Sequence, residues 1–168
     1  MMKKQRRWIA AWLACMLLVG TLSGCSMFGA KEKTFSKAGM SITLTSDFEE
    51  KELESLTVYY ESSNAIVAVL KEEFTLFDSL DLAAEDLTLN DYADLVLANN
   101  GLNAEIKEAN GLVYFNYEKD ANGKSNTYLA TVYKADDAFW LIQYCCPTDD
   151  YQKMEPGFIE WAQTVTFA

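Results

Sequence analysis

The chain has 168 residues and a formal net charge of −11, with 25 acidic and 14 basic side chains. This excess of negative charge disfavours nucleic acid and anionic lipid surfaces as binding partners. The chain contains no histidine, which excludes Ser-His and Cys-His catalytic arrangements and zinc sites built on imidazole.

The first 24 residues have the order of an export signal. Basic residues between positions 3 and 7 precede an uncharged apolar run over residues 8–19, and small residues then lead to Leu22-Ser23-Gly24-Cys25. This order is typical of a secretory signal peptide. An uncleaved membrane anchor is the alternative, because residues 8–24 reach the lower limit of about 17 residues for a transmembrane helix.

The four residues Leu22-Ser23-Gly24-Cys25 resemble the lipobox of bacterial lipoproteins. The resemblance implies cleavage between Gly24 and Cys25 and attachment of lipid to the Cys25 thiol, and we expect no other cofactor. Two or more acyl chains anchor a protein stably. We therefore predict a lipid-anchored protein on the cell membrane that faces away from the cytoplasm. Loss of the four cations in residues 1–24 would change the formal charge from −11 to −15.

Residues 25–34 contain glycine and charge without a sustained apolar period, which predicts a lipidated tether before a globular domain over residues 35–168. Residues 40–44 alternate between apolar and polar side chains and predict a half-buried strand. Residues 56–60 and 65–70 are separated by turn-forming residues, so they predict a β-hairpin.

One helix is predicted after the acidic segment 78–86. Thr88 suits the N-cap position, and Asp91 three residues later completes a capping box. Apolar residues recur with helical spacing over residues 89–97. The Asn-Asn-Gly run at 99–101 then predicts the end of the helix, because glycine adopts the left-handed conformation that is common there.

A meander of four strands is predicted next, over residues 104–108, 112–118, 127–133 and 138–144. Asn-Gly pairs at 110–111 and 122–123 supply two of its turns, since both residue types accept positive φ. Several of these strands carry apolar side chains on both faces, so a layer of structure must cover each face of the sheet. A final helix is predicted to begin at Pro156, which suits a first helical position, and residues 165–167 to form a short strand or cap.

The order of these elements favours an α+β fold in which helices flank an antiparallel sheet. Three patterns carry a family resemblance, namely Met40-Ser-Ile-Thr-Leu44 with Phe48, the strand at 138–144, and Phe158-Ile-Glu-Trp161 with Thr166-Phe167. Together they resemble the PsbP-like fold, an α/β/α sandwich shared with a Ran-GTPase-binding protein. The resemblance implies a noncatalytic module that binds a protein partner, and it transfers no functional residue to this chain.

Cysteine chemistry after residue 25 is limited to Cys145 and Cys146. Adjacent residues on a strand point to opposite faces, and their Cα atoms lie closer than an ordinary disulfide allows. We therefore expect free thiols, at least one of them packed as a small hydrophobic residue. A redox or metal role is the less favoured alternative.

Two segments are candidates for metal binding, although we predict no metal site. The acidic residues Asp78, Asp81, Glu85, Asp86, Asp91 and Asp94 supply oxygen ligands of the kind that calcium prefers. Two of them, Asp86 and Asp91, equally suit the positive end of the predicted helix. Residues 120–126 resemble a calcium loop but lack the glycine and glutamate spacing of an EF-hand, so a hairpin turn is favoured.

Three functional hypotheses follow, and we predict no catalytic residue. The first is a noncatalytic binding or accessory module with a protein partner, and the second is a binder of a small ligand or cation. The third is a carboxylate-dependent hydrolase, which a deep pocket that holds two acids with raised pKa values would favour. Tyrosines on the predicted strands suit a docking surface or, more simply, the sandwich core; they are Tyr59, Tyr60, Tyr114, Tyr117, Tyr128, Tyr133 and Tyr144.

Overall fold

The computed structural model describes residues 31–121 and 123–168. The predicted signal peptide, the cleavage site between Gly24 and Cys25, the lipid attachment at Cys25, most of the tether and Asn122 lie outside the described residues. No helix within the described ranges is long and apolar enough to span a membrane.

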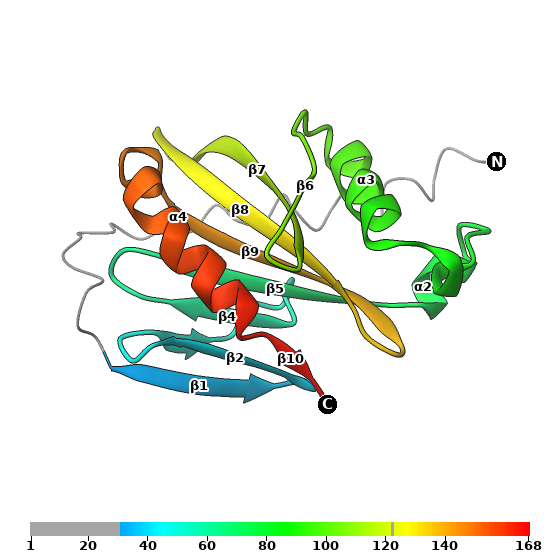
Figure 1. The fold of residues 1–168 in the computed structure, drawn as a ribbon, viewed down its shortest axis with the longest axis horizontal. Coiled ribbons are helices and arrows are strands. Elements are labelled where there is room, and N and C mark those ends of the chain that lie inside the picture. Colours follow the sequence, from blue (N-terminus) through cyan, green and yellow to red (C-terminus); the bar gives the residue numbers. More distant parts are fainter. Residues whose placement is uncertain (1–30, 122) are drawn as a thin grey trace.

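Within the described residues, the strands form two antiparallel sheets (Figure 1). The large sheet has the order β3-β4-β5-β9-β8-β7-β6, and the small sheet has the order β1-β2-β10. The strands are β1 (Glu32–Lys37), β2 (Met40–Thr45), β3 (Glu49–Lys51), β4 (Val58–Glu61), β5 (Ile66–Glu73), β6 (Lys107–Ala109), β7 (Leu112–Ala121), β8 (Lys124–Lys134), β9 (Ala138–Pro147) and β10 (Thr166–Phe167). The helices are α2 (Thr75–Asp78), the short 3₁₀ helix η1 (Ala84–Asp86), α3 (Leu89–Asn100) and α4 (Thr148–Gln163).

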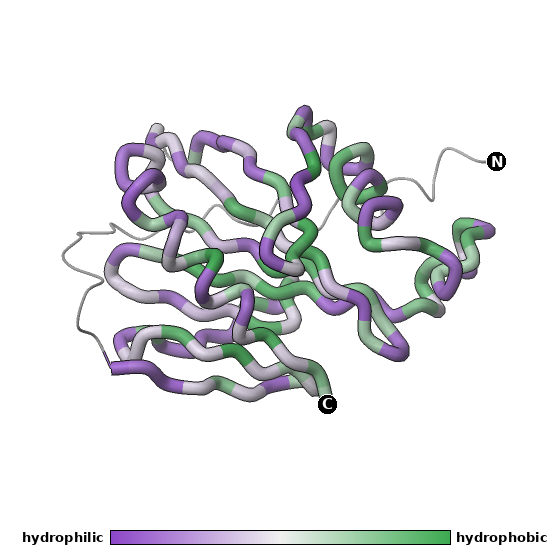
Figure 2. The backbone as a smooth tube through the Cα atoms, in the orientation of Figure 1, coloured by the Kyte–Doolittle hydropathy of each residue, from purple (hydrophilic) through white to green (hydrophobic). Residues whose placement is uncertain are grey.

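Structure covers both faces of the large sheet. One hydrophobic core lies between this sheet, α4 and the small sheet, and a second lies between its other face and the segment from α2 to α3. Along β9, Trp140 and Ile142 belong to the first core, whereas Phe139 and Leu141 belong to the second. Figure 2 shows hydrophobic residues along the central strands and hydrophilic residues at the turns. The predicted α+β fold, with helices flanking an antiparallel sheet, is confirmed.

The strand predicted at 40–44 is present as β2, but it pairs with β1 and β10 outside the large sheet. Met40, Ile42 and Leu44 are buried, whereas the polar residues between them are half-buried. A strand with one polar face suits an outer layer, because the central strands of the large sheet are buried on both faces. β1 was not predicted from the sequence; it begins at Glu32, before the expected start of the globular domain at residue 35.

The helix predicted after Thr88 is confirmed as α3. The Thr88 side chain accepts a hydrogen bond from the Asp91 N–H at 3.1 Å, and the Thr88 N–H donates to the Asp91 carboxylate at 2.9 Å. This reciprocal pair is the predicted capping box. At the other end Gly101 has a φ of 61°, in the left-handed region, so both helix ends lie where the sequence indicates.

The predicted hairpins are also present. The β4–β5 hairpin pairs residues 58–61 with 66–69, and Asn110 and Gly111, with φ of 56° and 76°, join β6 to β7. The strand predicted at 104–108 is wrong in position, since β6 covers only Lys107–Ala109. The preceding residues instead pack their apolar side chains against the second core without a strand partner.

The prediction that the last helix begins at Pro156 is wrong. α4 starts at Thr148, and Pro156 lies within it. Proline has no N–H, so the hydrogen bond to the carbonyl of Gln152 is missing. Gln152 and Pro156 are both exposed, so water can solvate that side of the helix. The first turn escaped prediction because Asp149 and Asp150 give no apolar stripe, although their charge suits a helix N-terminus.

Candidate functional site

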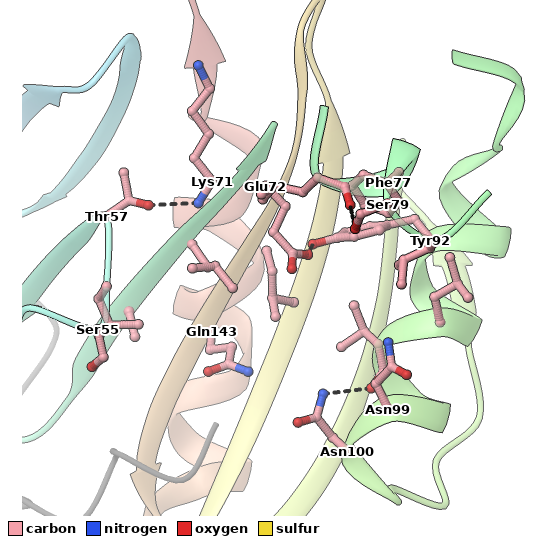
Figure 3. Close-up of a pocket in the computed structure, with 18 of the residues that line it drawn as sticks. Ser55, Thr57, Lys71, Glu72, Phe77, Ser79, Tyr92, Asn99, Asn100 and Gln143 are labelled. Carbon is pink, nitrogen blue, oxygen red and sulfur yellow. Dashed lines mark hydrogen bonds between the residues drawn. The ribbon is translucent and has the colours of Figure 1, made fainter. Parts of the chain in front are cut away.

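A cavity of about 860 Å³ opens on the α3 side of the large sheet (Figure 3). β5 and β9 form its floor, α3 and residues 54–57 form its walls, and the region of α2 closes one end. Most of the lining is apolar and includes Leu56, Leu70, Leu76, Leu80, Leu95 and Leu141. The cavity volume lies within the range of about 300–1,000 Å³ that is usual for small-molecule sites, and such sites are commonly lined by apolar residues.

The cavity exists because α3 covers only part of this face. α3 packs mainly against β7 and β8. It reaches β9 and β5 through Tyr92, and α2 contacts β5 at one end, so the side chains of β5 and β9 between these contacts line an open space. Thr57 holds the other wall in place. Its hydroxyl accepts a hydrogen bond from the Lys71 N–H at 2.8 Å, and its own N–H donates to the Val69 carbonyl at 2.9 Å.

Gln143, on β9, is one of the polar residues of the cavity floor. The residue is only 4% exposed, and its Nε2 has no hydrogen-bond partner among the described residues. Its neighbours across the sheet are Ala68 on β5 and Ala130 on β8. Neither alanine has a polar side-chain atom, so neither side chain pairs with the amide.

Glu72 and Tyr92 form the second polar feature of the lining. The Tyr92 hydroxyl donates a hydrogen bond to the Glu72 carboxylate, and Figure 3 shows the two side chains pointing toward each other. The Tyr92 ring stacks on Phe139, with centroids 4.4 Å apart and planes 9° apart. Burial raises the pKa of Glu72, although the hydrogen bond from Tyr92 opposes this shift. The pKa of Tyr92 is raised mainly by burial and secondly by the charge of Glu72.

No cation is available to the cavity from the lining residues. Lys71 contributes to the lining, but its ammonium pairs with Asp137 at 2.8 Å and lies 5.7 Å from the Trp140 ring centroid. Trp140 belongs to the first core, on the opposite face of the sheet. The acidic side chains of the lining are Glu54 and Glu72, so the cavity offers negative and neutral polar groups only.

The two cysteines predicted as free thiols are confirmed as free and buried. Cys145 belongs to the second core and Cys146 to the first, so they point to opposite faces as predicted. Burial raises the pKa of each thiol to about 12. Neither residue lines the cavity.

The candidate metal segments do not form a site in the part of the chain that the structure describes. No group of three or more Cys, Asp or Glu side chains there is arranged to hold a metal ion. The six acidic residues between 78 and 94 are all exposed, and Asp91 caps α3. Residues flanking 122 belong to the β7–β8 hairpin, where Ala121 pairs with Lys124, which confirms the hairpin interpretation of this segment.

The strand tyrosines form part of the core instead of an exposed docking face. Tyr60, Tyr128 and Tyr144 are fully or almost fully buried, and Tyr114 and Tyr133 are half-buried against the first core. Sequence reasoning missed Gln143 and Glu72. The available signal was a single amide within the apolar run 138–146, but a sequence does not show which buried polar side chains lack a partner.

Comparison with known proteins identifies the fold. No family model and no curated protein sequence matches the chain. Among solved structures, cyanobacterial PsbP from Synechocystis sp. PCC 6803 has a TM-score of 0.56 and 17% identity over 89% of this chain and 100% of its own. A Bacteroides thetaiotaomicron protein has a TM-score of 0.52 and 12% identity, over 83% of this chain and 48% of its own. A variant of protein Mog1 has a TM-score of 0.51 and 11% identity, over 82% and 96%. These likenesses show that the described domain has the PsbP-like fold.

Proposed function

We propose that this chain is a noncatalytic, lipid-anchored protein outside the cytoplasm whose globular domain binds a small amphiphilic molecule in the cavity between α3 and the β5–β9 floor. The observation that carries the proposal is a largely apolar cavity with an unpaired, buried amide, that of Gln143, in its floor. Cavities of about 300–1,000 Å³ with few polar groups in an apolar lining commonly hold small ligands.

A protein partner, the other expectation from the fold, has less support in the structure. Leu76 is the one large hydrophobic side chain that is exposed, at 55%, within the described ranges. It lies on α2 and lines the cavity. Protein docking sites usually present a contiguous apolar patch of several hundred Å², so the apolar surface of this domain favours a ligand that enters the cavity.

The absence of catalysis in this proposal is supported by the arrangement of the acids. A carboxylate-dependent hydrolase needs two acids that flank the scissile bond. Glu72 is largely buried and accepts a hydrogen bond from Tyr92, whereas Glu54 is exposed on the wall segment. The chain also lacks histidine as a general base.

Anchoring through Cys25 rests on the lipobox. We expect Cys25→Ser to leave an unprocessed precursor without lipid, because the hydroxyl does not replace the acylated thiol. Membrane fractionation and mass spectrometry of the wild type and this variant test the anchor. Equal processing and equal membrane association of the two would contradict it.

Ligand binding is tested by blocking the cavity. Leu95 is a half-buried α3 residue of the lining, so Leu95→Trp should reduce the affinity for a neutral fluorescent dye such as N-phenyl-1-naphthylamine at least tenfold. Leu89→Trp is the matched control, because Leu89 is also half-buried on α3 but does not line the cavity. No saturable dye binding by the wild type, or equal affinity of both variants, would contradict a ligand site here.

A further inference from the structure

The cavity floor contains a hydrogen-bond donor that the fold leaves unused. Nε2 of Gln143 is buried without a partner, and the side chains beside it across the sheet, Ala68 and Ala130, end at Cβ. A buried donor without a partner is costly, and its cost is recovered when an acceptor arrives. A ligand oxygen at this position therefore gains more than it would at a solvated amide.

Charge on the lining argues against an anionic head group. The ammonium of Lys71 is paired with Asp137 and lies on the other face of the sheet. Glu72 and Glu54 add negative charge to the lining. A carboxylate or phosphate that enters would lose its hydration without gaining a counter-ion.

Glu72, the second polar residue of the floor, already has a hydrogen-bond partner. Glu72 accepts the Tyr92 hydroxyl and is four residues from Ala68 on β5, the residue paired with Gln143. At roughly 3.3 Å per residue the two positions are about 13 Å apart along the strand. Leu70 and Leu141, which pair with each other, lie between them, so the floor is apolar over that length.

Building on the proposed function, we propose that the cavity selects an uncharged amphiphile, whose chain lies over Leu70 and Leu141 and whose hydroxyl or carbonyl oxygen accepts a hydrogen bond from Gln143. This assigns the class of ligand as a neutral lipid-like alcohol or ester. Fatty acids and phosphorylated lipids are disfavoured by the charge of the lining.

Three probes with the same ten-carbon tail test the choice of head group. They are 1-decanol, decanoate and decylammonium, each used to displace the neutral dye from the chain that begins at residue 25 and carries Cys25→Ser. The described fold lies entirely within that chain. We expect decanol to bind at least tenfold more tightly than decanoate at pH 7, and tighter binding of decylammonium than of decanol would show that the acidic lining selects a cation instead.

Substitution of the amide tests its role. Gln143→Leu should weaken decanol binding about 5- to 10-fold, as expected for one hydrogen bond. Gln152→Leu, on the exposed side of α4, is the matched control and should leave the affinity unchanged. The ranking of the three probes on the unsubstituted chain decides the inference if Gln143→Leu does not fold.

The two proposals fail in different ways. If the dye binds and Leu95→Trp blocks it, but an ionic probe binds more tightly than decanol, the inference about the head group is wrong and the ligand site stands. The same holds if Gln143→Leu folds and leaves decanol affinity unchanged. If neither dye nor probe binds, both proposals are overturned.

Discussion

Replacing Gln143 by methionine tests whether the amide in the cavity floor costs the empty protein stability. An unsatisfied buried donor costs about 1–3 kcal/mol, and Nε2 of Gln143 is such a donor. Methionine is close to glutamine in length and removes the donor, so the free energy of unfolding should rise by about 1–2 kcal/mol. For a domain of this size that gain corresponds to roughly 3–8 °C in Tm.

Urea denaturation at pH 7, followed by circular dichroism, measures the effect on the chain without ligand. Gln152→Met is the control, because its side chain is exposed on α4 and surface substitutions usually change stability by less than about 0.5 kcal/mol. A loss of about 1 kcal/mol or more in Gln143→Met would refute the reasoning, since it would mean that the amide has a partner in the folded protein. The gain in stability should be accompanied by weaker binding of a hydrogen-bond acceptor.

Three other predictions concern the acid, the thiols and the core. Burial raises the pKa of Glu72 above 4.5, so the contribution of this carboxyl to the free energy of unfolding falls as pH rises from about 4.5 toward the folded-state pKa. In urea denaturation at pH 4 to 8, Glu72→Gln should therefore lose stability less steeply with pH than the wild type. Equal slopes for the two proteins would contradict the raised pKa. Cys145 and Cys146 are buried, and burial raises the pKa of each thiol to about 12. In the Cys25→Ser chain, a thiol reagent at pH 8 should therefore label these two cysteines only after unfolding. Rapid labelling of the native protein would disprove their burial. Phe158→Ala empties a fully buried position in the first core and should cost about 3–5 kcal/mol, while dye affinity of the folded fraction stays unchanged because the cavity lies on the other face.

The elements that sequence reasoning predicted well are those with strong local signals. The Thr88 capping box defines one end of α3 and Gly101 the other, because side-chain and backbone hydrogen bonds within a few residues determine them. Apolar residues on both faces of the strands at 127–133 and 138–144 predicted that both faces of the sheet are covered, and the two hydrophobic cores confirm this. The Cys145-Cys146 pair also obeyed the simple alternation of a strand.

The errors have longer-range causes. Placing β2 in a separate small sheet depends on pairing with β10, from the opposite end of the chain. The early start of α4 depends on its packing, because a helix with Pro156 inside lacks a hydrogen bond that tertiary contacts must offset. The cavity is harder still to predict from the sequence, because it depends on which strands α3 leaves uncovered and on which buried polar atoms lack a hydrogen-bond partner.

The width of the part of the sheet that α3 leaves uncovered, over β5 and β9, explains why a cavity forms there. Adjacent strands are about 4.8 Å apart, so β5 and β9 together span roughly 10 Å, and packed helices lie about 8–10 Å apart. The space beside α3 is therefore close to the width of one further helix, and the short helix α2 occupies only one end of it. An incidental packing gap of this size would be most stable with apolar side chains throughout its floor. Gln143 and Glu72 are instead held on that floor with the energetic cost of burial, and a ligand oxygen that pairs with the amide would remove part of that cost.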